Sequence, residues 1–228
     1  MANLNAVQTF SPGCRRCPRL ADFVRAAGQK YPGYYAKPVP SFGVEQARLL
    51  IVGLAPGLHG ANRTGRPFTG DHAGLLLYRT LHQFGFATAA ESVSADDGLE
   101  LVDCRITNAV RCVPPQNKPN TQEVKICNGY LQQELAGLGR SPVILALGSV
   151  AHGAVLRALA QRPADYKFGH GARHMLPGEL LLVDSYHCSR YNTQTRRLTE
   201  EMFAAVFQSI RELLDADRPG GPLPEVSQ

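Results

Sequence analysis

Four short apolar runs, separated by helical patterns, place the tightest limit on how this chain folds. They are Leu49–Leu54, Cys104–Val110, Val143–Leu147 and Leu180–Ser185. Each run is nearly continuous rather than alternating, as expected of strands that are covered on both faces. Strands that alternate with helices form a parallel sheet between layers of helices. The sequence therefore predicts an α/β fold, a three-layer α/β/α sandwich with a central four-stranded parallel sheet.

The expected helices have boundary signals of their own. Patterns with one apolar face cover Leu20–Lys30, Gly74–Phe84, Thr121–Leu135, a segment from Ser149, and Thr199–Leu214. Gly85 is a C-terminal stop signal, and Asn120 or Thr121 is an N-cap. Between these elements we expect an aromatic, proline-rich loop over Tyr31–Phe42 and a polar excursion over Ala87–Glu100.

Length and composition limit the chain to one large domain. It has 228 residues, of which 44% are hydrophobic, which is enough for a single core. We expect the domain to cover residues 1–214 and a disordered tail, rich in proline and glycine, to cover 215–228. No run of eighteen apolar residues and no secretion signal is present, which favours a cytoplasmic protein without a membrane span.

The nineteen residues Gly53–Asp71, which follow the first apolar run, form the most informative motif. Glycine and proline keep this stretch irregular, and glycine lets the main chain come close to a ligand. Its large groups are Asn62, Arg63, Arg66, Phe68 and Asp71. An aromatic face, two guanidinium groups and a carboxylate suit a nucleic-acid base and its phosphates. The alternative is a surface loop that only joins a strand to a helix.

Polar residues also follow the other strands, at the edge where parallel sheets bind ligands. Asn108 lies in the second run and His187 follows the fourth. We therefore expect Phe68, Asp71, Asn108 and His187 to share one rim. A structural role is the alternative for each polar member: Asp71 as a helix cap, Asn108 as a strand end, His187 as a buried histidine.

The segment after His187 is basic and aromatic, with Ser189, Arg190 and Tyr191 followed by two more arginines. Such a loop can wedge into a duplex or hold phosphates, and its alternative is a solvated surface loop. The net charge is +5, which is compatible with nucleic-acid binding.

Four of the six cysteines have the spacing of a metal site. Cys14 and Cys17 form a Cys-x-x-Cys pair, whereas Cys112 and Cys127 are separated by fourteen residues. Thiolates suit zinc or an iron–sulfur cluster, and the spread second pair favours the cluster. Four unrelated thiols are the alternative. Cys104 and Cys188 lie in or at the end of apolar runs and are expected to be structural.

Together these motifs resemble the uracil-DNA glycosylase superfamily, and most closely its fifth, or type-b, family of iron–sulfur enzymes. The resemblance covers about residues 14–214 and rests on Gly53–Asp71, Ile106–Cys112, His187–Asn192 and the four cysteines. It implies a structural [4Fe-4S] cluster held by Cys14, Cys17, Cys112 and Cys127. The N-terminal segment of the single domain would then help to bind the cluster.

The resemblance also implies an activity, the removal of uracil and other deaminated bases, hypoxanthine included, from DNA. The base is flipped out and hydrolysed off, which leaves an abasic site for base-excision repair. Asp71 would activate water or support the sugar cation, Asn108 would bind the base edge, and His187 would stabilise the departing base. The base would lie on Phe68 and against Gly53, Leu54 and Ala55. The DNA contacts implied are Arg63, Arg66, Ser189, Arg190 and Tyr191.

The expected partner is damaged DNA, double-stranded with single-stranded DNA as an alternative form, and the expected state is a monomer without membrane contact.

Two departures from the family pattern bear on the site. Ala55 and Pro56 stand where many relatives have a polar catalytic side chain, so the burden moves to Asp71. Cys188 stands where relatives often have proline.

Two other functions remain as alternatives. One is a non-catalytic, metal-containing nucleic-acid-binding module. The other is an α/β hydrolase or nucleosidase acting on free nucleotides. The chain has neither a Gly-x-Ser-x-Gly elbow nor a Walker phosphate loop, which disfavours serine hydrolases and nucleotide triphosphatases.

Overall fold

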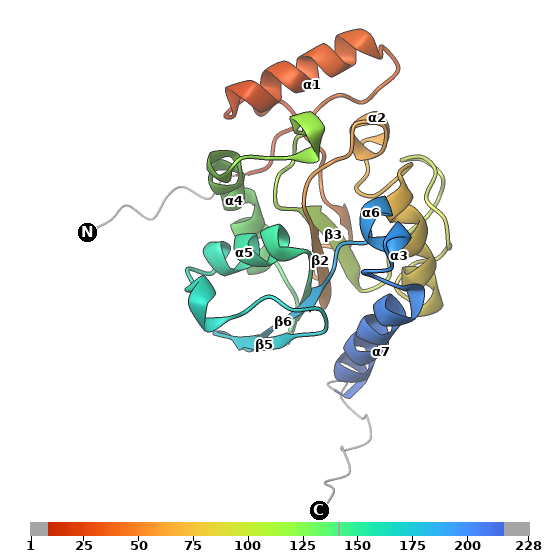
Figure 1. Cartoon of the computed structure of the whole chain (residues 1–228), viewed down its shortest axis with the longest axis vertical. Coiled ribbons are helices and arrows are strands. Elements are labelled where there is room, and N and C mark those ends of the chain that lie inside the picture. The colour runs from red at the N-terminus through yellow and green to blue at the C-terminus, as the bar shows by residue number, and fades with distance from the viewer. Residues whose placement is uncertain (1–8, 141, 217–228) are drawn as a thin grey trace, which may run out of the picture.

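A computed structural model describes residues 9–140 and 142–216 and contains one mixed sheet in the strand order β1-β3-β2-β4-β6-β5 (Figure 1). Its four central strands are parallel, which confirms the predicted core. They are β2 (Leu49–Gly53), β3 (Cys104–Asn108), β4 (Val143–Leu147) and β6 (Leu180–Ser185). Two short antiparallel edge strands, β1 (Phe42–Gly43) and β5 (Arg173–Leu176), were not predicted.

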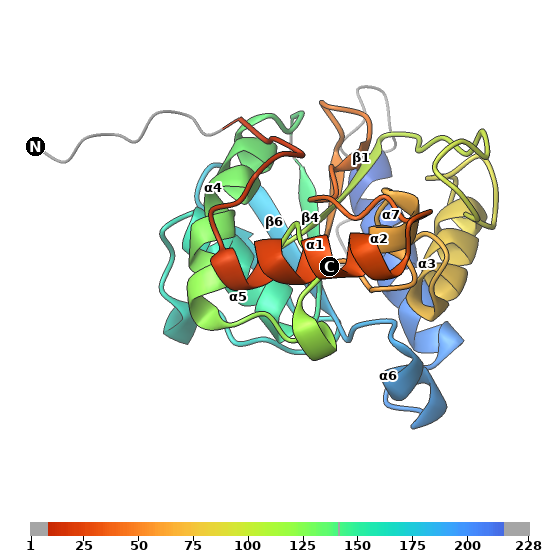
Figure 2. The same cartoon turned by 90° about the horizontal axis from the view of Figure 1, so that it is seen from above.

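Helices cover both faces of the sheet, as expected of a three-layer sandwich (Figure 2). In β2, Leu49 and Ile51 pack toward α3 (His72–Gln83) and α7 (Glu200–Ala216), whereas Leu50 and Val52 pack toward α4 (Thr121–Ala136) and α5 (Ser149–Ala158). All four side chains are fully buried. Truncating one of these larger side chains to alanine would therefore cost about 2–5 kcal/mol of stability.

Helix ends follow the sequence signals. Gly85, at φ +70°, follows the end of α3. Asn120 caps α4 through a capping box with Glu123. The first helix, α1 (Pro18–Lys30), lies across one end of the molecule, and its Leu20 joins the core on the α4 and α5 side.

Short elements lie between the predicted strands and helices. These are α2 (Ala61–Thr64), α6 (Arg190–Gln194) and the 3-10 turns η1 (Pro115–Asn117) and η2 (Pro163–Asp165). At the C-terminal end, α7 continues through residues 215 and 216, so the predicted tail starts too early. The rest of that tail, 217–228, lies outside the described residues. Within the described residues, no helix has the length and apolar character needed to cross a bilayer.

Candidate active site

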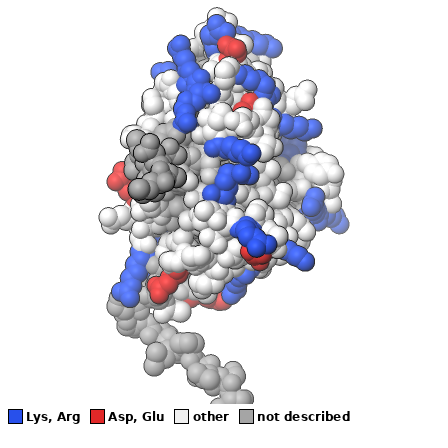
Figure 3. Space-filling model, turned by 90° about the vertical axis from the view of Figure 1, so that its left-hand side faces the viewer, with Lys and Arg blue, Asp and Glu red and all other residues white. Residues whose placement is uncertain are grey.

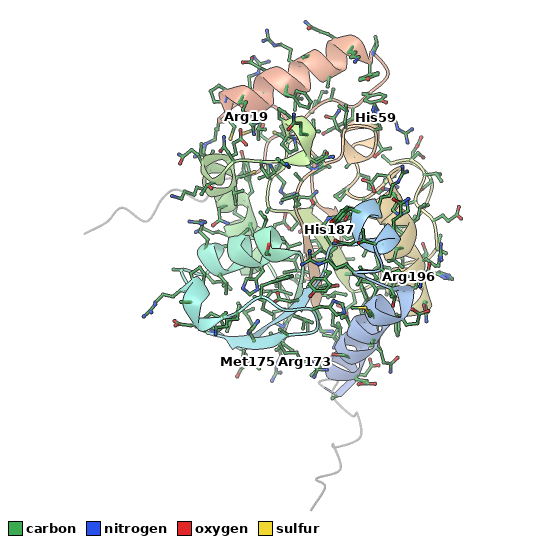
Figure 4. The ribbon with its side chains drawn as sticks, viewed as in Figure 1. Arg19, His59, Arg173, Met175, His187 and Arg196 are labelled. Atoms are coloured by element: carbon green, nitrogen blue, oxygen red, sulfur yellow. The ribbon has the colours of Figure 1, made fainter. Side chains whose placement is uncertain are left out.

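A cavity of about 440 Å³ opens at the carboxyl ends of the central strands. The structure brings the predicted rim residues together here, along with two residues of the expected base pocket. The cavity lining includes Leu54, Ala55, Phe68, Asp71, Asn108 and His187. Figure 4 labels His187 at the centre of the molecule, between the sheet and α6.

The Asp71 carboxylate is both a helix cap and a wall of the cavity. Its Oδ1 accepts a hydrogen bond from the Gly74 N–H at 3.0 Å, which caps α3. Its Oδ2 lies against the glycine-rich loop, where a Cβ on Gly60 would be only 2.4 Å away. Burial raises the pKa of this carboxyl above its usual value. The predicted helix cap and the predicted rim position therefore belong to the same side chain.

Phe68 is held in a strained backbone conformation. Its φ is +55°, in the left-handed region that non-glycine residues rarely adopt. The first turn of α3 packs on its carbonyl so closely that a Cβ on Gly74 would lie 1.8 Å from that oxygen. The Phe68 ring faces the His187 ring at 5.9 Å between centroids and 27° between planes. The strain therefore fixes an aromatic surface inside the cavity.

Asn108 lies beside Gly53 across the β2–β3 ladder. A Cβ on Gly53 would be 2.4 Å from the Asn108 Oδ1 and 2.6 Å from the Phe68 ring, so only glycine leaves room for both side chains. The Asn108 Oδ1 is buried and has no hydrogen-bond partner among the described residues. A buried oxygen without a partner costs free energy. A bound ligand with an N–H group would supply the missing partner.

His187 is a neutral imidazole at physiological pH. Burial lowers its pKa to about 4, and its Nδ1 has no partner among the residues that the structure describes. Its main chain is fixed by Asn192, whose Nδ2 donates to the His187 carbonyl at 2.8 Å. A neutral ring of this kind offers one donor and one acceptor.

Four of the five predicted DNA contacts lie at or near the surface, whereas the fifth, Arg66, is buried. Ser189 caps α6 and lines the cavity together with Arg190. Tyr191 is 70% exposed. Arg63 is exposed, and its Nε donates to the His59 carbonyl at 2.8 Å.

Arg66 does not fit the predicted DNA contact. Its side chain is buried, and its Nη1 binds Asp97 at 2.7 Å while its Nη2 donates to the Ala95 carbonyl at 2.6 Å. It also lies over the Phe42 ring. Burial raises the pKa of Asp97, but its hydrogen bonds with the Leu99 N–H, Arg66 and two further N–H groups outweigh this and bring the pKa to about 2. Arg66 therefore fastens the 87–100 excursion to the sheet edge.

The four cysteines predicted to bind a metal line one small cavity. They come from the N-terminal segment, the loop after β3 and helix α4. Burial, together with the charges of Cys127, Cys14, Cys17 and Glu123, raises the pKa of Cys112 to about 12, as expected if the four sulfurs lie near one another. Four converging thiols are a donor set that fits a soft metal centre. Cys104 and Cys188, by contrast, are fully buried in the core, as expected.

One polar cluster escaped the sequence analysis. His152 Nδ1 lies 2.8 Å from Asp184 Oδ1, its Nε2 lies 3.0 Å from the Tyr166 carbonyl, and His174 Nε2 lies 3.3 Å from Asp184 Oδ2. Both partners of His152 are acceptors, and both are satisfied only when each ring nitrogen carries a proton. Without a free lone pair His152 is a poor metal ligand, and the cluster is a buried ion pair. No pattern in the sequence connects residues 152 and 184.

Comparison with known proteins identifies the class. The family model of the uracil DNA glycosylase superfamily matches residues 40–211. The chain belongs to this superfamily. Among its relatives are type-5 uracil-DNA glycosylases from Thermus thermophilus, 47% identical over 91% of this chain and 96% of that protein, and from Mycobacterium leprae, 42% identical over 88% and 91%. A type-5 uracil-DNA glycosylase from Pyrobaculum aerophilum is 40% identical over 86% of each chain.

Proposed function

We propose that this protein is a monofunctional uracil-DNA glycosylase of base-excision repair, similar in action to its type-5 relatives. The observation that carries the proposal is one cavity that combines the Asp71 carboxylate with two unpartnered buried polar atoms, Asn108 Oδ1 and His187 Nδ1. The enzyme hydrolyses the bond between base and sugar and leaves an abasic site.

Base recognition follows from the Asn108 amide. Uracil presents an N–H donor next to a carbonyl acceptor, and an amide with a free oxygen and an NH₂ group complements that edge. Hypoxanthine presents the same order of donor and acceptor, whereas cytosine and adenine present the reverse. We therefore propose hypoxanthine as a second substrate. The Phe68 ring would stack on either base and contribute about 1–3 kcal/mol.

The chemistry of bond cleavage assigns the remaining roles. Base flipping costs a few kcal/mol, and cleavage then leaves positive charge on the sugar and negative charge on the base. The Asp71 carboxylate supports the positive charge and orients the attacking water. His187, neutral at pH 7, donates a hydrogen bond to the departing base. Removal of one such preorganised donor typically lowers the rate about 10²–10³-fold.

The four-cysteine cavity supports a second proposal, a structural [4Fe-4S] cluster held by Cys14, Cys17, Cys112 and Cys127. Such a cluster would tie the N-terminal segment to α4, in a cavity that shares no lining residue with the active-site cavity. Iron and acid-labile sulfide in the purified protein, both lost in Cys17→Ser together with thermal stability, would support it. Purified protein that holds zinc instead, or a Cys17→Ser variant of full stability, would contradict it.

The surroundings of the reaction are also proposals. The side chains assigned to the reaction, Asp71, Asn108 and His187, line one cavity of a single chain, so a monomer would suffice for the proposed reaction. A cytoplasmic location is likewise proposed, because the proposed substrate is DNA. The exposed Arg63, Arg190 and Tyr191 would contact double-stranded DNA, with single-stranded DNA as a second substrate form.

The test is excision from end-labelled duplexes that carry one uracil or one hypoxanthine, followed by hot alkali and gel analysis. We expect a break at the damaged base, none in undamaged DNA and none with Asp71→Asn. Tight binding without a break would favour the non-catalytic binding module. Cleavage of free nucleosides without activity on DNA would favour the nucleosidase.

A further inference from the structure

The net positive charge of this protein arises from a small part of its sequence. The whole chain has 24 basic and 19 acidic residues, a net charge of +5. Residues 1–40 contain six basic residues and a single acidic one, Asp22, so they alone account for the net charge. The remaining residues hold eighteen of each sign. The basic residues of this segment are Arg15, Arg16, Arg19, Arg25, Lys30 and Lys37.

Four of these six cations, Arg15, Arg16, Lys30 and Lys37, are exposed and have no ion pair with any described residue, and the last two lie beside tyrosines. Arg19 is paired with Glu123, and Arg25 with Asp22. The ammonium groups of Lys30 and Lys37 lie over the rings of Tyr31 and Tyr35, at 5.4 and 5.8 Å from the ring centroids.

The tyrosines that follow α1 connect this charge to the cavity. Tyr31 and Tyr34 stack at 4.7 Å with 16° between planes. The Tyr34 hydroxyl lies 2.8 Å from His59 Nδ1. His59 belongs to the glycine-rich loop, between two cavity-lining residues, Gly57 and Ala61.

Main-chain hydrogen bonds fasten the same two segments together. The Tyr35 N–H donates to the Arg63 carbonyl and the Ala36 N–H to the Asn62 carbonyl, both at 3.0 Å. In Figure 4, the labelled His59 lies beside α2, below the end of α1. Figure 3 shows Lys and Arg side chains at the α1 end of the molecule, and others further down the face in view. We define the lysine–tyrosine strip as Lys30, Tyr31, Tyr34, Lys37, His59 and Arg63.

We propose that the lysine–tyrosine strip binds the phosphate backbone of DNA on one side of the flipped nucleotide. The inference rests on the proposed glycosylase function and extends its DNA contacts to a surface beyond the cavity. Unpaired cations and a tyrosine hydroxyl are donors for phosphate oxygens and carry no sequence information. The strip includes no carboxylate, so nothing in it repels the DNA. It therefore holds DNA of any sequence while the cavity selects the base.

The test compares two double variants that remove the same charge. Lys30→Gln/Lys37→Gln alters the strip, whereas Arg157→Gln/Lys167→Gln alters exposed cations at the far end of α5 and beyond it. Binding to a uracil-containing duplex is measured over a range of salt concentrations at a temperature that suppresses turnover. The slope of log K against log salt is negative, and each lost phosphate contact reduces its magnitude by about 0.9. We therefore expect the magnitude of the slope to fall by about 2 in the strip variant and to stay unchanged in the control.

Excision under single-turnover conditions with saturating protein separates binding from chemistry. We expect both double variants to match the unaltered protein, because the strip does not touch the reacting base. An unchanged salt slope in the strip variant, with excision retained, would overturn the proposal, as would an equal loss in both variants. An unaltered protein that fails to excise uracil at all would overturn the proposed function instead.

Discussion

The carboxylate of Asp71 occupies the space in which a side chain on Gly60 would lie. A Cβ at residue 60 would be 2.4 Å from Oδ2 and 2.8 Å from the carboxyl carbon of Asp71. The glycine-rich loop therefore sets the position of the carboxylate, while the Gly74 N–H sets its orientation.

Replacing Gly60 by alanine should displace the carboxylate. Misplacement by about 1 Å is enough to lower a rate about 10²-fold. We expect this loss in the single-turnover excision of uracil, with DNA affinity unchanged. Gly153→Ala in α5 is the matched control, because nothing lies within 4 Å of a Cβ there. Full activity of Gly60→Ala would mean that Asp71 needs no fixed position.

Asp71→Asn should separate capping from catalysis. An asparagine still caps α3, but it can neither support the sugar cation nor orient water as a carboxylate does. Because burial raises the pKa of Asp71, the ionised form destabilises the fold. At pH 8 the melting temperature of Asp71→Asn should therefore be no lower than that of the unaltered protein. Any excess in melting temperature should disappear as the pH falls through the Asp71 pKa. Excision should nevertheless be nearly abolished.

The pH dependence of excision should follow Asp71 and not His187. The carboxylate must be ionised, so the rate should fall as the pH falls through a pKa above the usual aspartate value. His187, with its pKa near 4, stays neutral from pH 5 to 8. His187→Gln should thus lower the rate without changing the shape of the profile in that range. A limb near pH 6.5 that disappears in His187→Gln would contradict this assignment.

The buried pair of His152 and Asp184 should make stability depend on pH. Burial lowers the pKa of His152, but the hydrogen bond and charge of Asp184 outweigh it and raise the pKa above the ordinary value. The stabilisation is then complete below about pH 6.5 and is lost as the pH rises through the folded-state pKa. Melting temperatures measured from pH 6 to 9 should decline. Asp184→Asn should be less stable by about 3–5 kcal/mol and should lack this decline.

The sequence was sufficient for the parts of the fold that depend on continuous apolar runs. Leu49–Gly53 is buried along its whole length and the other central strands are mostly buried, so most of their residues carry the apolar signal. The edge strands have no such pattern, because Phe42–Gly43 is only two residues long and Arg173–Leu176 is half exposed. The residues at the rim of the cavity could be predicted because they follow strand ends, and a parallel sheet brings the carboxyl ends of its strands to one edge.

Side-chain pairs whose members are far apart in the chain could not be predicted from the sequence. The residues next to Arg66 in the sequence are those expected around an exposed, phosphate-binding arginine. Only the fold brings Asp97 to its guanidinium group. His152 and Asp184 are likewise paired by the packing of α5 on β6. A single sequence shows which groups are chargeable, whereas the pairing of charges depends on the tertiary structure.

The excess positive charge of the first forty residues lies in and next to α1, and it adds to the molecule an electric dipole component that points toward that helix. In the field of DNA, such a dipole turns the protein during approach, so that α1 and the adjoining mouth of the cavity arrive first. The effect is kinetic: a larger fraction of encounters with DNA begins at this end than at the rest of the chain, whose charges sum to zero. Added salt should accordingly slow association more than it hastens dissociation.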